Sequence, residues 1–176
     1  AAARAGWEQY NKWKPKEFQD VKVLYIYATG PGWMHTKKPV RSVDDMKGMK
    51  IRVTGAGVGG VKAVGGEPVA MVMGETYLPA QKGTIDSLIS PLETLQGWKH
   101  AEVFQYSTFV PQFYSEFFYV VMNQAKWNSL PKDLQAAFDS VADEAVSEAG
   151  QIWEHAQKNG MEYAKKEPKG HEFIQL

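Results

Sequence analysis

An arginine inside a short apolar stretch is the first residue of this sequence whose type and place could do chemistry. Arg52 stands between Ile51 and Val53, in a segment with the pattern of a β-strand. A guanidinium group binds a carboxylate through two parallel, charge-assisted hydrogen bonds. Arg52 is therefore a binding group for an organic acid, a solvated strand position, or an ion-pair partner for Asp44 or Asp45. The residue pattern leaves these alternatives open.

A glycine-rich turn after the same strand could bind a phosphate group. Residues 55–60, GAGVGG, match GxGxxG, and Glu75 follows at about the distance of a ribose-binding carboxylate. This pattern predicts, as one alternative, a dinucleotide-dependent oxidoreductase with Gly55, Gly57 and Gly60 beside a pyrophosphate. However, the next helix has barely two turns, and pyrophosphate binding needs no arginine in the strand. The competing interpretation is an ordinary glycine-rich turn, whose amides could still bind a carboxylate.

The sequence has no arrangement typical of a catalytic or metal site. The histidines, His35, His100, His155 and His171, are scattered, and none pairs with another at ligand spacing beside a carboxylate. There is no cysteine, no GxSxG motif and no recognisable pair of nucleophile and base. We therefore predict no catalytic residue, no metal, no cofactor and no enzymatic activity.

Further candidate binding residues lie in turns and at the ends of predicted strands. The stretch GPGWMHTKKP, residues 30–39, is interpreted as a loop that exposes Trp33 and His35. Such a loop is either functional or an ordinary connector. Tyr77 lies in the first turn of a predicted helix, where core packing is its alternative role. Ser90 ends a predicted strand, where its hydroxyl could bind a ligand or cap the next helix.

The composition limits the possible partners. The chain has 176 residues, of which 44% are hydrophobic and 23% charged, as in ordinary globular proteins. Twenty basic residues balance twenty acidic ones, so we expect neither a nucleic acid nor an anionic membrane as partner. The apolar run at 117–122 is only strand-length, so no membrane insertion is expected. The first residues look like the middle of a helix, without a signal peptide, so we expect a fragment whose natural N-terminus lies elsewhere.

The hydrophobic pattern predicts an α/β chain that would position these residues. Strands are expected at 21–28, 49–54, 68–73 and 84–90, with short helices between the last three. This order predicts parallel strands with right-handed crossovers, and ligands bind beyond the carboxyl ends of such strands. Arg52, Met73 and Ser90 lie at those ends, so we expect all three to point into one crevice.

Helices are expected at both ends of the sequence. Residues 3–14 have the pattern of an amphipathic helix, and residues 126–165 are predicted to be mostly helical. At least two strands, broken near Pro111, are expected before the long helix. The apolar face predicted for that helix consists of Leu134, Ala137, Phe138, Val141, Ala145 and Ala149.

Three segments, in this order, resemble one protein family. They are HTKKPVRSVDDMKGMKIRV at 35–53, VGGEPVAMVMGETYLPAQKGTIDSLISPLETL at 64–95, and FFYVVMNQAKWNSLPKDLQAAF at 117–138. They resemble the DctP-type substrate-binding proteins of TRAP transporters, the tripartite ATP-independent periplasmic carriers. The resemblance extends over about residues 20–165 and is far more specific than the glycine pattern.

The resemblance implies a periplasmic-binding-protein-like fold, or venus flytrap, in which strands and a spanning helix join two α/β domains. It implies that this chain is mostly the second domain and lacks most of the first. Residues 1–28 would form a helix and the first interdomain strand, and residues 29–120 the ligand-binding α/β domain two. Residues 121–176 would hold the end of the return strand and the long C-terminal spanning helix.

The resemblance also assigns roles to single residues. Arg52 matches the family's arginine that clamps the ligand carboxylate, and Tyr77 matches a tyrosine near the pocket. Ser90 falls where many members have asparagine. Some relatives bind a metal together with the ligand, and Glu93 is the carboxylate of interest for such a role. Met73 completes the expected pocket.

Two departures from the family pattern concern the ligand. Ser87-Leu88-Ile89 stands where many members have Gly-Gln-Glu, which suggests a more apolar ligand. The stretch GPGWMH lacks a second arginine that some members carry, and Trp33 and His35 stand in its place. These differences favour a hydrophobic or aromatic monocarboxylate over a polyhydroxyl acid such as sialic acid.

The leading hypothesis is a periplasmic solute-binding receptor. It would capture an organic acid in an interdomain cleft and deliver it to the membrane subunits of a TRAP transporter, without chemistry. The alternative is a dinucleotide-binding oxidoreductase domain that uses the GAGVGG turn. A third possibility is a globular interaction domain with no small ligand.

Overall fold

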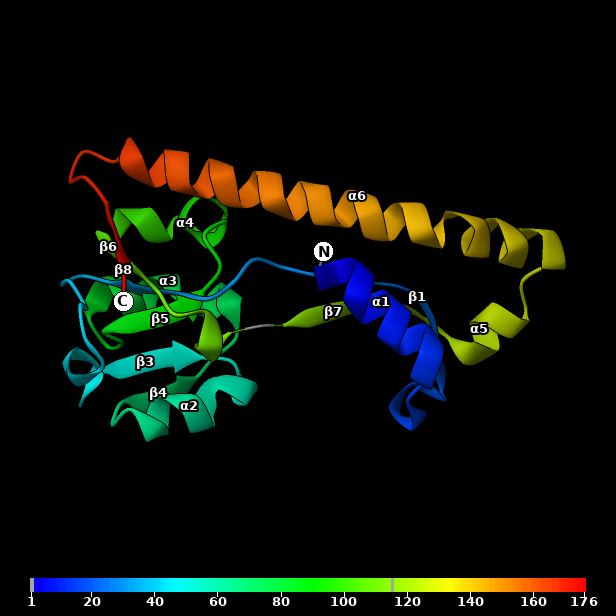
Figure 1. The fold of residues 1–176 in the computed structure, drawn as a ribbon, viewed down its shortest axis with the longest axis horizontal. Helices are drawn as coiled ribbons and strands as arrows, with labels where there is room; N and C mark the ends of the chain where they lie inside the picture. The colour runs from blue at the N-terminus through cyan, green and yellow to red at the C-terminus, as the bar shows by residue number, and fades with distance from the viewer. Residues whose placement is uncertain (1, 115) are drawn as a thin grey trace. The chain divides into compact units, whose positions relative to one another are not determined.

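The computed structural model describes residues 2–114 and 116–176, which divide into two compact units (Figure 1). The first unit combines Ala1–Thr29 with Glu116–Glu154, and the second combines Gly30–Ser115 with His155–Leu176. Each unit is therefore built from segments that are far apart in the sequence. The long helix α6 (Lys132–Lys165) begins in the first unit and ends in the second.

The first unit contains a pair of antiparallel strands. β1 (Val21–Ala28) pairs with β7 (Phe117–Asn123), as the β-branched and aromatic residues of both segments favour. The predicted strand at 21–28 is confirmed. Helix α1 (Ala2–Trp13) packs on β1, and the cluster between them consists of Ala3, Trp7, Val23, Ile26 and Val146.

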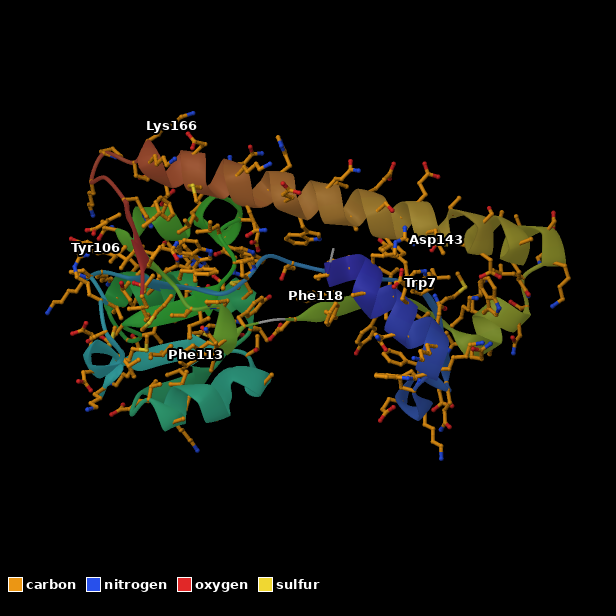
Figure 2. All side chains as sticks on the ribbon, viewed as in Figure 1. Trp7, Tyr106, Phe113, Phe118, Asp143 and Lys166 are labelled. Carbon is orange, nitrogen blue, oxygen red and sulfur yellow. The ribbon has the colours of Figure 1, made fainter. Side chains whose placement is uncertain are left out.

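A polar contact joins α1 to α6 within this unit. The indole Nε1 of Trp7 donates a hydrogen bond to Asp143 Oδ1 over 2.9 Å, and Arg4 donates to the same oxygen over 2.9 Å. Figure 2 labels Trp7 and Asp143. Val146, on the next turn of α6, is buried in the same cluster. Asp143 and Val146 therefore mark the side of α6 that faces α1.

The prediction of the apolar face of the long helix is wrong for its large residues, because they are exposed. Leu134, Phe138 and Val141 are 47%, 40% and 49% exposed, whereas Val146, which the prediction omitted, is buried. Helical periodicity finds the apolar side of a helix, but it does not say which side has a partner. The prediction that residues 126–165 are mostly helical is confirmed, although α5 (Gln124–Asn128) is a separate helix that precedes α6.

The second unit is built around a six-stranded sheet. Its order is β4 (Glu67–Ala70), β3 (Lys50–Val53), β5 (Ser87–Ser90), β2 (Trp33–Thr36), β6 (Tyr106–Phe109) and β8 (Glu172–Gln175). β3 is parallel to both β4 and β5, which confirms the predicted parallel arrangement. β2 is antiparallel to β5 and β6, and β6 is parallel to β8.

The two faces of the sheet carry separate hydrophobic clusters. On one face, Met34 of β2 packs in a cluster with Ile51 of β3 and Val61 of α2 (Val58–Ala63). On the other face, Trp33 packs in a cluster with Leu95 of α4 (Thr94–Gly97). Trp33 and Met34 are adjacent, so strand alternation sends them to opposite faces. Figure 1 shows α2 and α4 on opposite sides of the sheet.

Local signals set the ends of the short helices. Ser42 and Asp45 form a capping box at the 3₁₀ turn Val43–Met46. Helix α3 (Tyr77–Lys82) ends at Gly83, whose φ of +74° is a left-handed conformation that glycine adopts without strain.

Three strand predictions differ from the structure. Residues 33–36 were predicted as loop but form β2, a central strand with neighbours on both sides. β4 ends at Ala70 rather than 73, so Met73 lies in the 3₁₀ turn Met73–Glu75. Strand β8 was not predicted. Short strands such as these depend on pairing with neighbours, which a local pattern does not reveal.

In the described part of the chain, no helix has the length and apolar character needed to cross a membrane.

Candidate functional site

One row of residues crosses the sheet of the second unit and contains Arg52. The strand register aligns Val69, Arg52, Leu88, His35, Ser107 and Phe173. Residues in register on neighbouring strands point to the same face of a sheet. Arg52 therefore lies on the face opposite to Ile51 and Val53, directly beside Leu88.

Arg52 is a buried cation, with 2% of its surface exposed. Its Nε donates a hydrogen bond to the Met71 carbonyl over 2.8 Å. Burial excludes water, and hydrogen bonds to a charged group are stronger in such surroundings than at the surface. The strand holds the backbone of Arg52, and the Met71 carbonyl holds one edge of its guanidinium. The arginine side chain is thus oriented before any ligand binds.

A buried histidine and threonine lie near Arg52. Thr76, which precedes α3, has its Oγ1 2.8 Å from Nε2 of His100, a residue of the 3₁₀ turn His100–Glu102. Burial, and then the positive charge of Arg52, lowers the pKa of His100 to about 4. Neither residue was predicted to have a role in binding. No spacing motif links position 76 to position 100, so no sequence signal could have found the pair.

Ser90 lies at the carboxyl end of β5 and is fully buried. Thr94 Oγ1 donates to the Pro91 carbonyl over 2.9 Å and lies 2.7 Å from Ser90 Oγ. Because the one hydroxyl proton of Thr94 goes to the carbonyl, Ser90 donates to Thr94. Its oxygen remains able to accept a hydrogen bond. Ser90 does not cap α4, whose N-cap is Glu93 without a side-chain cap hydrogen bond.

Trp33 and His35 are not exposed, so that prediction is wrong. Both lie in β2 and are buried. The ring of Trp33 packs against Phe109 and Phe173, with centroids 5.0 and 5.9 Å apart. The loop prediction failed because glycines and prolines flank the segment, while its own four residues fill a central strand. Trp33 belongs to the same register row as Ser90, on the sheet face of Arg52.

His35 belongs to a buried hydrogen-bonded group. Its Nδ1 lies 2.7 Å from Ser107 Oγ, and Ser107 Oγ lies 2.7 Å from Nε2 of His171. Burial first, and then the nearby His100 and His171, holds the pKa of His35 well below its usual value. The structure thus gathers three histidines that are scattered in the sequence. Ser107 is fully buried among them, so it has no access to a substrate as a nucleophile.

Tyr77 packs on the hydrophobic cluster that contains Leu88, the neighbour of Arg52, whereas Glu93 lies in the segment after β5. The Tyr77 hydroxyl donates to Glu102 over 2.7 Å, and this bond raises the pKa of the tyrosine. Glu93 precedes α4, and burial raises its pKa to about 7. Glu102, the partner of Tyr77, belongs to the same 3₁₀ turn as His100. The structure therefore brings together Arg52, Ser90, Trp33 and His35 on one face, with Met73 in the adjoining turn.

A hollow of about 490 Å³ lies at the amino ends of the parallel strands, opposite to the carboxyl ends where a ligand was expected. It is lined by residues near the amino ends of β3 and β5, including Lys38, Lys47 and Asp86. No predicted site residue contributes to it. Among the described residues, no group of three or more histidine, cysteine or acidic side chains is placed to hold a metal ion.

The GAGVGG turn serves close packing in this structure. A β-carbon on Gly57 would lie 3.0 Å from Cβ of Val53, and one on Gly60 would lie 3.2 Å from a ring carbon of Phe113, labelled in Figure 2. Helix α2, which follows, has only six residues. Gly57 and Gly60 thus let the turn and the helix approach their neighbours closely, whereas a β-carbon on Gly55 would meet no atom within 4 Å. Packing therefore accounts for two of the three glycines in the pattern.

Comparison with known proteins decides the family. Residues 6–176 match DctP, described as bacterial extracellular solute-binding protein, family 7. The chain belongs to the DctP family. The resemblance expected from the sequence is confirmed, and the oxidoreductase alternative finds no support in these matches. The relatives are solute-binding proteins.

One relative of this DctP chain is named for the compound that it binds. The 2,3-diketo-L-gulonate-binding periplasmic protein of Escherichia coli K12 is 31% identical over 134 residues, which are 73% of this chain and 40% of that protein. The chain therefore spans less than half of that relative.

Solved structures of TRAP solute-binding proteins share the fold. The protein of Rhodoferax ferrireducens T118, in complex with copurified benzoate, is 28% identical with a TM-score of 0.89, covering 99% of this chain and 56% of that one. The protein of Pseudomonas putida F1, with bound D-glucuronate, is 33% identical with a TM-score of 0.84, covering 96% and 55%. The α/β fold of this DctP chain is thus that of the venus-flytrap binding proteins, over about half of their length.

Proposed function

We propose that the protein carrying this chain is a periplasmic receptor that captures an organic acid and delivers it to the membrane subunits of a TRAP transporter. Family membership supports the receptor role and the periplasmic location. Related structures hold benzoate and D-glucuronate, which are both carboxylates. The domain boundaries expected from the sequence, 1–28, 29–120 and 121–176, are part of this proposal.

The observation that carries the proposal is the buried, oriented guanidinium of Arg52. A ligand carboxylate would accept two parallel hydrogen bonds from it. Each bond to a charged group contributes about 1.5–3 kcal/mol, and the pair fixes the direction of the ligand. Ser90, Trp33, His35 and Met73 complete the proposed ligand surroundings. The proposal extends to Tyr77 and Glu93 only through the family resemblance.

The ligand class we propose is a hydrophobic or aromatic monocarboxylate. Leu88 lies beside Arg52 in the register and is fully buried, at a position where the family resemblance leads us to expect a polar residue in many members. Trp33, on the same sheet face, lies in an aromatic cluster with Phe109 and Phe173. Apolar and aromatic surroundings favour an apolar ligand body next to the carboxylate.

A binding experiment on the complete natural protein tests the proposal. Calorimetry with benzoate, D-glucuronate and NADH would compare the wild type with Arg52→Ala. The control is Arg41→Ala, because Arg41 is an exposed arginine that pairs with Glu172 over 2.6 Å. We expect a carboxylate to bind the wild type, and Arg52→Ala to weaken it by roughly 100-fold or more, from the loss of two charged hydrogen bonds.

Three results would contradict the proposal. Binding of NADH alone, indifferent to Arg52, would favour the oxidoreductase alternative. Equal carboxylate affinity in the wild type and Arg52→Ala would remove Arg52 from the site. Stronger binding of D-glucuronate than of benzoate would leave the receptor role intact and overturn the proposed ligand class.

A further inference from the structure

The segment after β4 connects Arg52 to a buried histidine. At one end of it, the Met71 carbonyl accepts a hydrogen bond from Arg52 Nε over 2.8 Å. At the other end, Thr76 Oγ1 donates to the Met73 carbonyl over 2.7 Å and lies 2.8 Å from Nε2 of His100. Segment 71–76 is therefore bonded to Arg52 at its start and to His100 at its end.

These distances place the protons. A carbonyl oxygen has no proton, so the contact between Thr76 Oγ1 and the Met73 carbonyl requires the hydroxyl to donate. A hydroxyl has a single proton, so the second bond must be donated by His100 Nε2. His100 is neutral at pH 7, because burial and the charge of Arg52 lower its pKa to about 4. The neutral ring is thus held with its proton on Nε2.

Side-chain packing on the middle of segment 71–76 is sparse, and two backbone hydrogen bonds within it form the 3₁₀ turn. Val72 is 64% exposed, and Gly74 and Glu75 are exposed as well. A β-carbon on Gly74 would meet only a Trp98 ring carbon, at 3.8 Å. Thr76 and His100, in contrast, are 0% exposed. The Met71 carbonyl thus lies between Ala70, which pairs with Val53 at the end of β4, and a turn whose far end is held by the buried bonds of Thr76.

We propose that Thr76 and His100 are positioning residues for Arg52, which hold segment 71–76 so that the Met71 carbonyl orients the guanidinium toward a carboxylate. The inference rests on the proposed function, because it takes Arg52 as the ligand clamp. A guanidinium forks onto a carboxylate in one plane, so a rotation about its side chain weakens both bonds together. Water cannot replace the lost bond at buried positions, so the segment shifts when Thr76 or His100 loses its polar group.

The first test needs no ligand. Nitrogen-15 NMR of the complete natural protein would follow the Arg52 Nε–H signal, assigned by its loss in Arg52→Lys. We expect Thr76→Val to speed its exchange with water about tenfold or more, the effect of losing one hydrogen bond of about 1.4 kcal/mol. Thr76→Ser keeps the hydroxyl and should behave as the wild type. Unchanged exchange in Thr76→Val would overturn the inference.

Matched variants separate positioning from general damage to the core. Thr108 is also fully buried and donates to the Val40 carbonyl over 2.8 Å, so Thr108→Val removes a similar hydroxyl elsewhere. It should leave the Arg52 signal unchanged. His100→Gln retains a donor for Thr76 and should preserve the signal, whereas His100→Leu should act like Thr76→Val. Equal effects of His100→Gln and His100→Leu would also overturn the inference.

Affinity for benzoate and D-glucuronate completes the test. We expect Thr76→Val to weaken carboxylate binding about tenfold when it is introduced into the wild-type protein. It should have no effect when it is introduced into Arg52→Lys, where the arginine Nε bond to Met71 is already lost. If Arg52→Ala leaves binding unchanged, the proposed function fails. If Arg52→Ala abolishes binding while Thr76→Val alters neither affinity nor exchange, only the positioning role fails.

Discussion

Gly160 of α6 lies directly against the backbone of Leu92, the second residue after β5. A β-carbon at Gly160 would overlap the Leu92 carbonyl oxygen and lie 2.8 Å from its carbonyl carbon. The same β-carbon would lie 2.9 Å from Cα of Glu93. Because backbone cannot rotate away as a side chain can, only glycine lets the helix and the α4 segment approach so closely. This contact fixes the C-terminal part of α6 in the second unit.

We expect Gly160→Ala to lower the free energy of unfolding by about 1–3 kcal/mol, the usual cost of overpacking a core. Gly150→Ala, in the same helix, is the matched control, because a β-carbon there would meet no atom within 4 Å. It should stabilise the protein by about 0.5–1 kcal/mol through helix propensity. Thermal unfolding followed by circular dichroism measures both. Equal effects of the two substitutions would contradict the close contact.

Glu93 makes the stability of the protein depend on pH. Burial raises its pKa from 4.5 to about 7 in the folded state. Between these values the folded protein holds a proton that the unfolded chain has lost, so this residue lowers stability as the pH rises. We expect Glu93→Gln to be more stable than the wild type at pH 8, by at most about 3 kcal/mol, and similar to it at pH 4. Urea unfolding at both pH values measures the difference. An increase in stability of Glu93→Gln that is the same at both pH values would show that ionisation of the buried Glu93 is not its cause.

The buried histidines make the protein less stable as the pH falls, whereas Glu93 makes it less stable as the pH rises. Burial lowers the pKa of His100 and of His171 to about 4, against 6.5 in the unfolded chain. Between pH 6.5 and 4 the unfolded chain binds protons that the folded protein excludes, so these residues lower stability as the pH falls. In Glu93→Gln, where the opposing carboxyl is absent, we expect stability to decrease steadily over this range. Proton NMR of the histidine rings checks the cause, since titration of either ring near pH 6.5 would refute it.

Trp7 stabilises the first unit through its indole nitrogen as well as its ring. It is buried against β1, and its Nε1 donates to Asp143. We expect Trp7→Phe to lower the free energy of unfolding by roughly 1–2 kcal/mol, from the lost charged hydrogen bond and part of the packing. Trp13→Phe in the same helix, at a side chain 68% exposed, should change it by less than about 0.5 kcal/mol. Calorimetric melting compares the two, and similar losses would show that the Asp143 bond contributes nothing.

Part of the architecture follows from local pattern. The strand at 21–28 and the parallel core of β3, β4 and β5 were predictable, because hydrophobic runs alternate there with glycine and capping signals. The 3₁₀ turn after Ser42 and the end of α3 at Gly83 have side-chain chemistry that acts within a few residues. Arg52 could be identified as a candidate because a charged residue inside an apolar strand is costly to bury unless it binds a partner. The family resemblance rests on the order of such segments.

The rest required the folded chain. Trp33 and His35 have turn-forming neighbours, yet they lie in a central strand because β5 and β6 pair with that segment from both sides. The partners of α6 could not be identified, because an amphipathic pattern does not reveal which face meets α1. Thr76 and His100 meet across 24 residues without any spacing rule. The sequence by itself determined the strand at 21–28, the parallel core of the sheet and most of the helices, and it showed that Arg52 is unusual. Only the tertiary structure decided what surrounds Arg52, because contacts between distant segments depend on how the sheet pairs and not on local preference.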